Sequence, residues 1–367
     1  MGVRVTIAGV GIHPFGRFEG KTNTDMGVHA VREALAEAGN PSFQAAFCGT
    51  AYGGVASGHK VLGALARTGM PIVDIEAGCA SGGAALQLAA GAIRAGQYDC
   101  VLVFGVEKMP KGIIRSSFFE PWREEAGLAA TPAYFALRAQ RLLRESGLTK
   151  DDLARVVVKN RTHGTNNPNA MFQKPVTAEE VLASRLVCEP LHLWMLCSPN
   201  EGAAAVVLRR DGEGVTLASA RLRSHLPGSV LGEATPLAGI DDREITPPST
   251  LAAEDAYEEA GVGPSDIDVV ECQDTDAARE LLAYQELGLC APGEQRKLLD
   301  DRAHVLNPSG GLLSKGEPLG ASALGQVVEL VHQLRGTAGA RQVEDARVGL
   351  AHTVGRGANA CAVIVTR

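Results

Sequence analysis

A faint internal duplication constrains the fold of this chain more than any other feature of its sequence. Residues 30–39 (AVREALAEAG) recur in pattern as residues 252–261 (AAEDAYEEAG). Each copy predicts an amphipathic helix that ends at a glycine suited to a left-handed C-cap. A proline and then a short apolar run follow each copy, which predicts strands at 45–48 and 267–271.

The two halves also share a glycine-rich segment further along the chain. Residues 79–83 (CASGG) correspond to residues 307–311 (NPSGG), and each segment precedes a predicted helix. A closing strand follows in both halves, at 100–104 and 348–351. Two βαβ-type halves with right-handed crossovers predict two mixed sheets layered with helices. The alternative is a chance similarity between helices rich in alanine and glutamate.

Composition excludes several classes of protein. The chain has 367 residues, more than one ordinary domain, and 43 glycines against only 4% aromatics, which indicates closely packed α/β elements. A net charge of −7 without a polybasic run argues against binding nucleic acid, and no apolar run is long enough to cross a membrane. The eight cysteines are scattered without a CxxC pair, so we expect no metal site, no disulfide framework and a reducing, cytoplasmic location.

Cys79 lies where a predicted strand at 72–75 meets a predicted small-residue helix at 84–93. Three glycines would supply the turn between them: Gly78, Gly82 and Gly83. A thiol at a helix N-terminus is favoured as the thiolate, and the unpaired amides there can receive an oxyanion. The sequence therefore predicts a nucleophile at Cys79, with a buried structural cysteine as the alternative.

Residues 109–208 differ in pattern from the two halves and look like an insertion. They contain predicted helices at 133–146 and 178–184, a polar loop at 163–173, and a core strand from 200 to 208. Insertions on a rigid scaffold commonly carry substrate contacts. We therefore divide the chain into an N-terminal half, an inserted loop domain and a C-terminal half: residues 1–108, 109–208 and 209–367.

These motifs, in their order and spacing, resemble the thiolase superfamily, and within it the sterol-carrier-protein-type thiolases and lipid-transfer-protein-like enzymes. The resemblance rests on the duplicated halves, the Cys79 turn and four further segments: residues 105–109, 163–173, 200–208 and 307–320. It implies a duplicated αβαβα five-layered core, an obligate homodimer, acyl-CoA substrates and Cys79 as the acylated nucleophile. It also implies coenzyme A as co-substrate, with no bound cofactor or metal.

The chain departs from the family at its acid–base residues. The Gly-His-Pro motif of the family reads Gly-Glu-Pro around Glu317, and a His-Asp-Cys-Phe motif reads Gln-Asp-Thr-Asp from Gln273. The Gln273 amide can still donate a hydrogen bond to an oxyanion, whereas the Thr275 hydroxyl cannot act as a base near neutral pH. His352 matches a histidine in the family's last active-site loop.

Two acid–base candidates remain, Glu317 and His352. A carboxylate beside a thiolate is electrostatically unfavourable, so we expect His352 to be the general base, with a structural histidine as the alternative. The resemblance assigns four substrate-binding positions: Asn307, Gly311, His163 and Gly355.

Three functions are consistent with the sequence. The first is a thiolase-type acyltransferase acting on a 3-oxoacyl-CoA, such as a branched, steroidal or aromatic one, through a Cys79 thioester. The second is an aldol lyase that acts on a 3-hydroxyacyl-CoA without a covalent intermediate, and the third is a non-catalytic acyl-CoA- or lipid-binding subunit. Relatives in this group often act with a small partner that combines a zinc ribbon and an OB-fold, so we expect such a partner chain here.

Overall fold

The computed structural model describes residues 2–112, 122, 125–126, 131–227, 245–355 and 359–367. Nine strands form a continuous mixed sheet in the order β3-β2-β4-β7-β1-β8-β11-β10-β9. The first half of the chain supplies five of them: β3 (Ile72–Ile75), β2 (Ala45–Gly49), β4 (Cys100–Lys108), β7 (Glu201–Arg210) and β1 (Val5–Gly16). The second half supplies the other four: β8 (Thr216–Arg223), β11 (Asn359–Thr366), β10 (Val348–Gly355) and β9 (Val269–Cys272).

The pairing of the strands repeats the duplication seen in the sequence. In the first half β2 and β4 are parallel, β7 pairs antiparallel with β4, and β1 pairs antiparallel with β7. In the second half β9 and β10 are parallel, β11 pairs antiparallel with β10, and β8 pairs antiparallel with β11. The two predicted sheets are continuous because β1 and β8 meet at the pair Thr6–Thr216.

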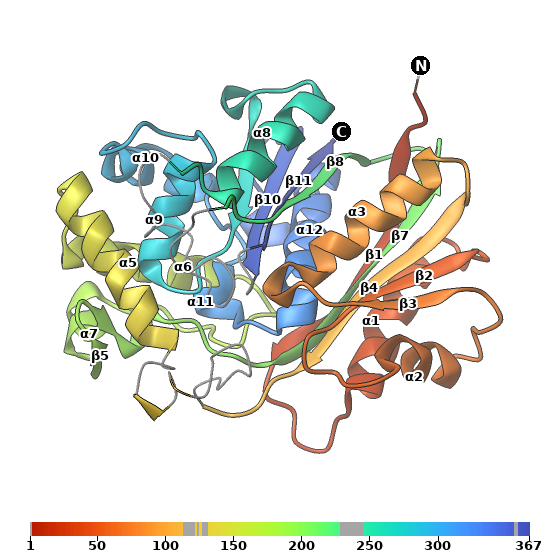
Figure 1. The fold of residues 1–367 in the computed structure, drawn as a ribbon, viewed down its shortest axis with the longest axis horizontal. Coiled ribbons are helices and arrows are strands. Elements are labelled where there is room, and N and C mark those ends of the chain that lie inside the picture. Colours follow the sequence, from red (N-terminus) through yellow and green to blue (C-terminus); the bar gives the residue numbers. More distant parts are fainter. Residues whose placement is uncertain (1, 113–121, 123–124, 127–130, 228–244, 356–358) are drawn as a thin grey trace.

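Helices separate and cover the two halves of the sheet, as Figure 1 shows. On the outer face of the first half lie α1 (Asn23–Glu37) and α2 (Ser57–Ala64), while α8 (Pro248–Ala260) packs on β8 and β11. Between the halves lie α3 (Ser81–Arg94) and α12 (Leu319–Arg335), which pack on strands of both. The predicted five-layered αβαβα fold is thereby confirmed. The duplicated helix also ends as predicted in the second half, where Gly261 has a φ of 68°.

The small residues of α3 allow it to approach its neighbours closely. A Cβ on Gly83 would lie 2.5 Å from the Cys361 sulfur, and one on Gly82 would lie 2.9 Å from the Leu324 Cγ atom of α12. Both glycines lie inside the first turn of α3, so their predicted role in the preceding turn is wrong. Of the three glycines, only Gly78 has a positive φ, 59°.

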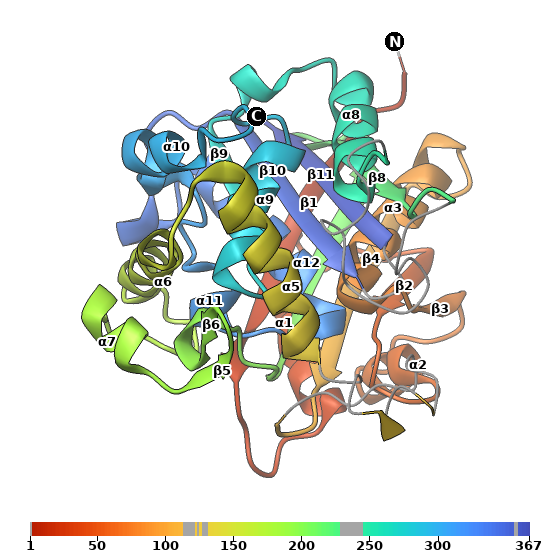
Figure 2. The same cartoon turned by 60° about the vertical axis from the view of Figure 1, so that its left-hand side comes forward.

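The described elements between β4 and β7 that follow residue 130 gather on one side of the sheet, as Figure 2 shows. They include α5 (Thr131–Ser146), α6 (Lys150–Gly164), α7 (Ala178–Ala183), β5 (Leu186–Cys188) and β6 (Leu191–His192). Three shorter helices lie in the second half: α9 (Ala277–Glu286), α10 (Gln295–Arg302) and α11 (Gly311–Lys315). The predicted polar loop begins too early, because His163 still belongs to the last turn of α6. Across the described ranges, we find no helix with both the length and the apolarity needed to span a bilayer.

Candidate functional site

Cys79 opens into a cavity of about 470 Å³ at the junction of the two halves and the intervening segment. It lies on a short 3₁₀ turn, Gly78–Ala80, which leads directly into α3. The Ser81 hydroxyl fixes this turn, because it accepts a hydrogen bond from the Ala77 amide at 2.9 Å and donates one to the Gly78 carbonyl at 2.6 Å. The side chain of Cys79 is 6% exposed. The prediction that Cys79 stands at a helix N-terminus is therefore confirmed.

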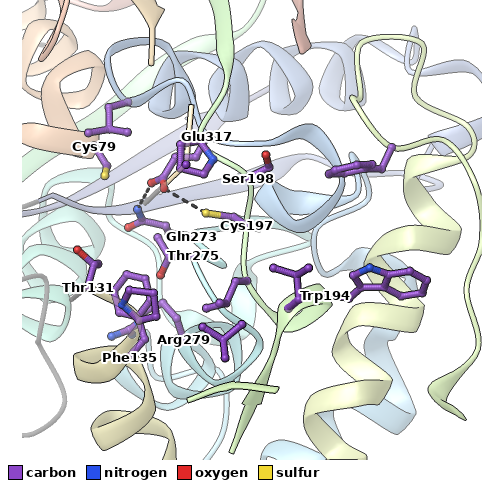
Figure 3. Close-up of a pocket in the computed structure, with 18 of the residues that line it drawn as sticks. Cys79, Thr131, Phe135, Trp194, Cys197, Ser198, Gln273, Thr275, Arg279 and Glu317 are labelled. Atoms are coloured by element: carbon purple, nitrogen blue, oxygen red, sulfur yellow. Dashed lines mark hydrogen bonds between the residues drawn. The ribbon is translucent and has the colours of Figure 1, made fainter. Parts of the chain in front are cut away.

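Three polar side chains gather beside Cys79 in the cavity wall, as Figure 3 shows. Glu317, which is buried, accepts a hydrogen bond from the Gln273 amide nitrogen at 2.8 Å through one oxygen and one from the Cys197 thiol at 3.3 Å through the other. The Gln273 carbonyl oxygen accepts from the Val354 amide. The side-chain amide nitrogen of Gln273 carries two hydrogens, and only one of them is used in the bond to Glu317. The second hydrogen remains for an oxyanion in the cavity.

The backbone around Glu317 is held as tightly as its side chain. Its amide donates to the Ser198 carbonyl at 2.9 Å, and its carbonyl accepts from the Asn200 amide at 3.4 Å. The segment before α12, which contains Glu317, thus runs alongside the segment before β7, which contains Cys197. These two segments are far apart in the sequence, and their pairing brings the two side chains together. The Glu317 backbone is therefore fixed beside Ser198 and Asn200, with its carboxylate toward the Cys197 thiol.

Cys197 is a site residue that the sequence analysis missed. Burial raises the pKa of its thiol well above the ordinary value, and the negative charges of Glu317, Asp274 and Cys79 raise it further. The thiol is therefore protonated at neutral pH. One sequence feature could have indicated Cys197, namely its position just before the predicted core strand, which is β7. Because β7 runs antiparallel to β4, the start of β7 lies at the same edge of the sheet as the carboxyl end of β4.

His352 lies outside the residues that line the cavity. Its side chain is fully buried on β10, and its Nε2 atom lies 3.0 Å from the Ser249 hydroxyl at the start of α8. Burial, with the nearby charge of Arg279, lowers the pKa of His352 well below the ordinary value, so the ring is neutral. This geometry favours the alternative of a structural histidine over the predicted general base.

Two of the four predicted substrate-binding positions, Asn307 and His163, hold the backbone. Asn307 has a φ of 52°, and its side-chain oxygen accepts from the Cys272 amide at 2.8 Å. The His163 Nδ1 atom donates to the Asn307 carbonyl at 2.9 Å, and burial lowers the pKa of His163 to about 4. Neither side chain lines the cavity.

The other two positions are glycines whose neighbouring atoms leave no room for a side chain. A Cβ on Gly311 would lie 2.2 Å from the Asp274 carboxylate, which accepts hydrogen bonds from the first amides of α11. A Cβ on Gly355 would lie 2.1 Å from the Ala77 carbonyl, two residues before Cys79. Gly355 thus supports the turn that carries the nucleophile, whereas Gly311 shapes the loop before α11.

The rest of the cavity wall is apolar and aromatic, with several arginines. Apolar residues of the segment between β4 and β7 contribute to it, among them Phe135, Phe172, Val187, Leu193, Trp194 and Leu196. Among the described residues, the arginines that line it are Arg17, Arg138, Arg161, Arg185 and Arg279. Such a cavity suits a mainly apolar ligand of moderate size that carries a few polar groups. Among the residues described, no cluster of three or more His, Cys, Asp or Glu could hold a metal ion.

Comparison with known proteins identifies the family. The thiolase N-terminal domain matches residues 5–211, and a thiolase C-terminal domain-like family matches residues 239–367. Sterol carrier protein 2 of Bos taurus is 35% identical over 397 aligned residues, which cover 99% of this chain and 72% of that protein. The benzoylsuccinyl-CoA thiolase subunit BbsB of Thauera aromatica is 37% identical, with 97% of this chain and 96% of that protein covered.

A solved structure agrees with these matches over the whole fold. The Ltp2-ChsH2(DUF35) aldolase superposes with a TM-score of 0.86 at 26% identity and covers 99% of this chain and 97% of that one. The duplicated sheet, the Cys79 turn and the matched domains agree with one another, and the chain therefore belongs to the thiolase family.

Proposed function

We propose that this chain is an acyl-CoA C-acyltransferase that cleaves or forms a 3-oxoacyl-CoA through a thioester on Cys79. The observation that carries the proposal is the cluster in the cavity wall, where Cys79 stands at the start of α3 beside Glu317, Gln273 and Cys197. Two relatives support it by name, the benzoylsuccinyl-CoA thiolase subunit and the acetyl-CoA acetyltransferase of Methanothermobacter thermautotrophicus, which is 35% identical.

The reaction requires a nucleophile, a proton acceptor and donors for an oxyanion. The Cys79 sulfur attacks the C3 ketone, the bond between C2 and C3 breaks, and its electron pair leaves with the shortened acyl-CoA as an enolate that takes up one proton. The thiol of coenzyme A then attacks the Cys79 thioester, so that an acyl-CoA leaves and the cysteine regains its proton. No net oxidation or reduction occurs.

We assign the proton transfers to Glu317 instead of His352. Glu317 takes the Cys79 proton and returns it to the enolate carbon, because carboxylate and thiol line one cavity. Two hydrogen bonds orient the Glu317 carboxylate. The Cys197 thiol, which stays protonated, donates to one of its oxygens, and the Gln273 amide donates to the other. The second hydrogen of that amide stabilises the C3 oxyanion.

One observation favours a second function, a carbon–carbon lyase of the aldol type. The Ltp2-ChsH2(DUF35) complex with its TM-score of 0.86 is an aldolase. In this alternative Glu317 removes the hydroxyl proton of a 3-hydroxyacyl-CoA and the bond between C2 and C3 breaks. Its electron pair stays with the shortened acyl-CoA as an enolate, which takes the proton back at C2, and a carbonyl compound leaves without acylating Cys79. A carboxylate in place of the family's histidine is compatible with this role.

Product analysis separates the two functions. The full chain is incubated with 3-oxoacyl-CoA plus coenzyme A and, separately, with the matching 3-hydroxyacyl-CoA. Thiolysis gives two acyl-CoA products from the first substrate, whereas retro-aldol cleavage gives an aldehyde or ketone and one acyl-CoA from the second. Cys79→Ser abolishes the first reaction and spares the second.

We also propose a homodimer and a partner subunit. Among the described strands, β3 stands at one end of the sheet, and Val73 on it is 43% exposed, which suits pairing with a second copy. A partner subunit, which we expect to combine a zinc ribbon and an OB-fold, is in keeping with the paired name of the Ltp2-ChsH2(DUF35) aldolase and with the description of BbsB as a subunit. A cytoplasmic location is supported by the eight free cysteines.

A further inference from the structure

Arg161 is a buried cation in the cavity wall without a carboxylate partner in the described part of the chain. It belongs to the last turn of α6 and is 8% exposed. No hydrogen bond or ion pair joins it to another described residue, and its Nε atom is buried without an acceptor. A buried charge normally requires a partner, because the loss of hydration is costly.

The other buried arginines of the cavity are neutralised. Arg138 pairs with Asp276, and Arg279 pairs with Glu286, each within hydrogen-bond distance. Arg161 is the exception among these buried arginines. Burial alone lowers the pKa of its guanidinium to about 10, so it remains charged at neutral pH.

The position of the Arg161 guanidinium is fixed by an aromatic ring. Its central carbon lies 3.9 Å from the centroid of the Phe172 ring, a stacked cation–π contact. The Phe172 amide in turn donates to the Ser314 carbonyl at 2.9 Å, which ties the ring to α11. A stacked guanidinium presents its edge, with a fork of N–H donors, to the cavity, and this fork matches the two oxygens of a carboxylate.

We propose that Arg161 binds a carboxylate at the far end of the acyl group, so that the preferred substrates are acyl-CoA thioesters of dicarboxylic acids. The inference rests on the proposed function, since it assumes that an acyl-CoA occupies the cavity that Cys79 lines. The phosphates of coenzyme A are the competing source of an anion. A cavity of about 470 Å³ takes a ligand of drug-like size and not the acyl group together with the nucleotide.

The burial of Arg161 also favours a carboxylate on the acyl group over the phosphates of coenzyme A as its partner. The nucleotide end of coenzyme A is joined to the thioester by the long pantetheine arm, so its phosphates stay near the cavity mouth. Arg185, which lines the same cavity and is exposed, suits that location. Arg161 is buried, and a carboxylate a few atoms beyond the thioester reaches a buried position more readily.

The test measures binding without chemistry. Unreactive thioether analogues of coenzyme A that carry a terminal carboxylate on four to six carbons are compared with their terminal carboxamides by calorimetry on the full chain, with any partner that co-purifies. We expect the carboxylate to bind roughly ten- to a hundredfold more tightly, the range for a hydrogen bond to a charged group. Arg161→Met should abolish this preference, and Arg161→Lys should keep part of it.

Truncated ligands and a matched variant identify the anion. The preference should persist with N-acetylcysteamine analogues, which lack every phosphate, and Arg185→Met should leave it unchanged. Equal binding of carboxylate and carboxamide by the wild-type chain would overturn the inference. It would also be overturned if Arg161→Met weakened the binding of every coenzyme A ligand equally but did not weaken the binding of any N-acetylcysteamine analogue. Because no bond is made or broken, these results are independent of whether Cys79 becomes acylated.

Discussion

The Gln273 amide donates a hydrogen bond of 2.8 Å to the Glu317 carboxylate, and it does so inside a cavity that Cys79 also lines. The other Glu317 oxygen accepts from the Cys197 thiol, so both oxygens are oriented by donors. A family position that usually carries an imidazole thus holds a carboxylate in a fixed orientation. The proposed proton transfer by Glu317 depends on this arrangement.

Glu317→Gln should lower turnover by about two to four orders of magnitude, because it removes the proton acceptor while keeping the size of the side chain. His352→Gln should change turnover only a few-fold, since His352 lies outside the cavity wall and glutamine can still reach the Ser249 hydroxyl. Single-turnover rates with a saturating substrate are the measurement, and circular dichroism controls for folding. A folded His352→Gln variant that loses activity while Glu317→Gln keeps it would restore His352 as the base.

Cys79 should react with iodoacetamide at least tenfold faster than Cys197 or Cys272, because only the thiolate reacts and a helix N-terminus favours it. Burial raises the pKa of both other thiols well above the ordinary value. Peptide mapping after timed labelling measures the three rates, and an acyl-CoA that fills the cavity should protect Cys79. Labelling of Cys79 at the rate of Cys272 would mean that the turn before α3 does not activate it.

The sequence predicted the fold better than it predicted the acid–base residues. The duplication and the position of Cys79 follow from local patterns, which depend on residues close together in the chain. Glu317 and Gln273 were also found, because each replaces a family residue at a recognisable motif. They meet in space because β9 and the segment before α12 both end at the cavity.

The structure differs from the sequence-based expectations in how deeply particular side chains are buried, which local patterns do not encode. His352 and Asn307 lie in segments near the cavity, but their side chains bond to Ser249 and to the Cys272 amide instead. Cys197 bonds to Glu317, 120 residues away in the chain, and no motif marks such a pair. No local pattern marks Arg161 as buried either, and only the structure shows that it is.

The exposed edge of β3 should form the dimer interface. Val73→Glu places a charge on that edge and should convert a dimer into a monomer at micromolar concentration, because the charge would be buried by pairing. Leu226→Glu is the matched control, since Leu226 is a comparably exposed apolar residue, 39% against 43%, outside β3. Sedimentation velocity gives the oligomeric state. A wild-type chain that sediments as a folded monomer would contradict this interface.

Asp152 should stabilise the protein at neutral pH and lose this effect in acid. It accepts two hydrogen bonds from Arg296, at 2.8 and 2.7 Å, and one from the Thr149 amide at the start of α6. These contacts, the Arg296 bond foremost, lower the pKa of Asp152 to about 2. The stabilisation is therefore complete above the pKa of the unfolded state, about 3.9, and disappears as the pH falls through about 2.

Asp152→Asn should lower the free energy of unfolding by about 1 kcal/mol at neutral pH, a modest value because Arg296 is half exposed and solvent screens the pair. Urea unfolding at a series of pH values should show this difference shrinking below about pH 4. Asp151→Asn, on the exposed side of the same turn, is the control. A difference that stayed constant with pH would show that the charge of Asp152 is not involved.

Intact-mass spectrometry tests the central claim, a thioester on Cys79, most directly. The full chain is mixed with a 3-oxoacyl-CoA in the absence of free coenzyme A, quenched in acid and mapped by peptide. We predict a mass increase equal to one acyl group, located on Cys79, lost on addition of coenzyme A and absent in Cys79→Ser. Product formation without any adduct on Cys79, unchanged in Cys79→Ser, would contradict the thioester mechanism and leave the aldol lyase as the function.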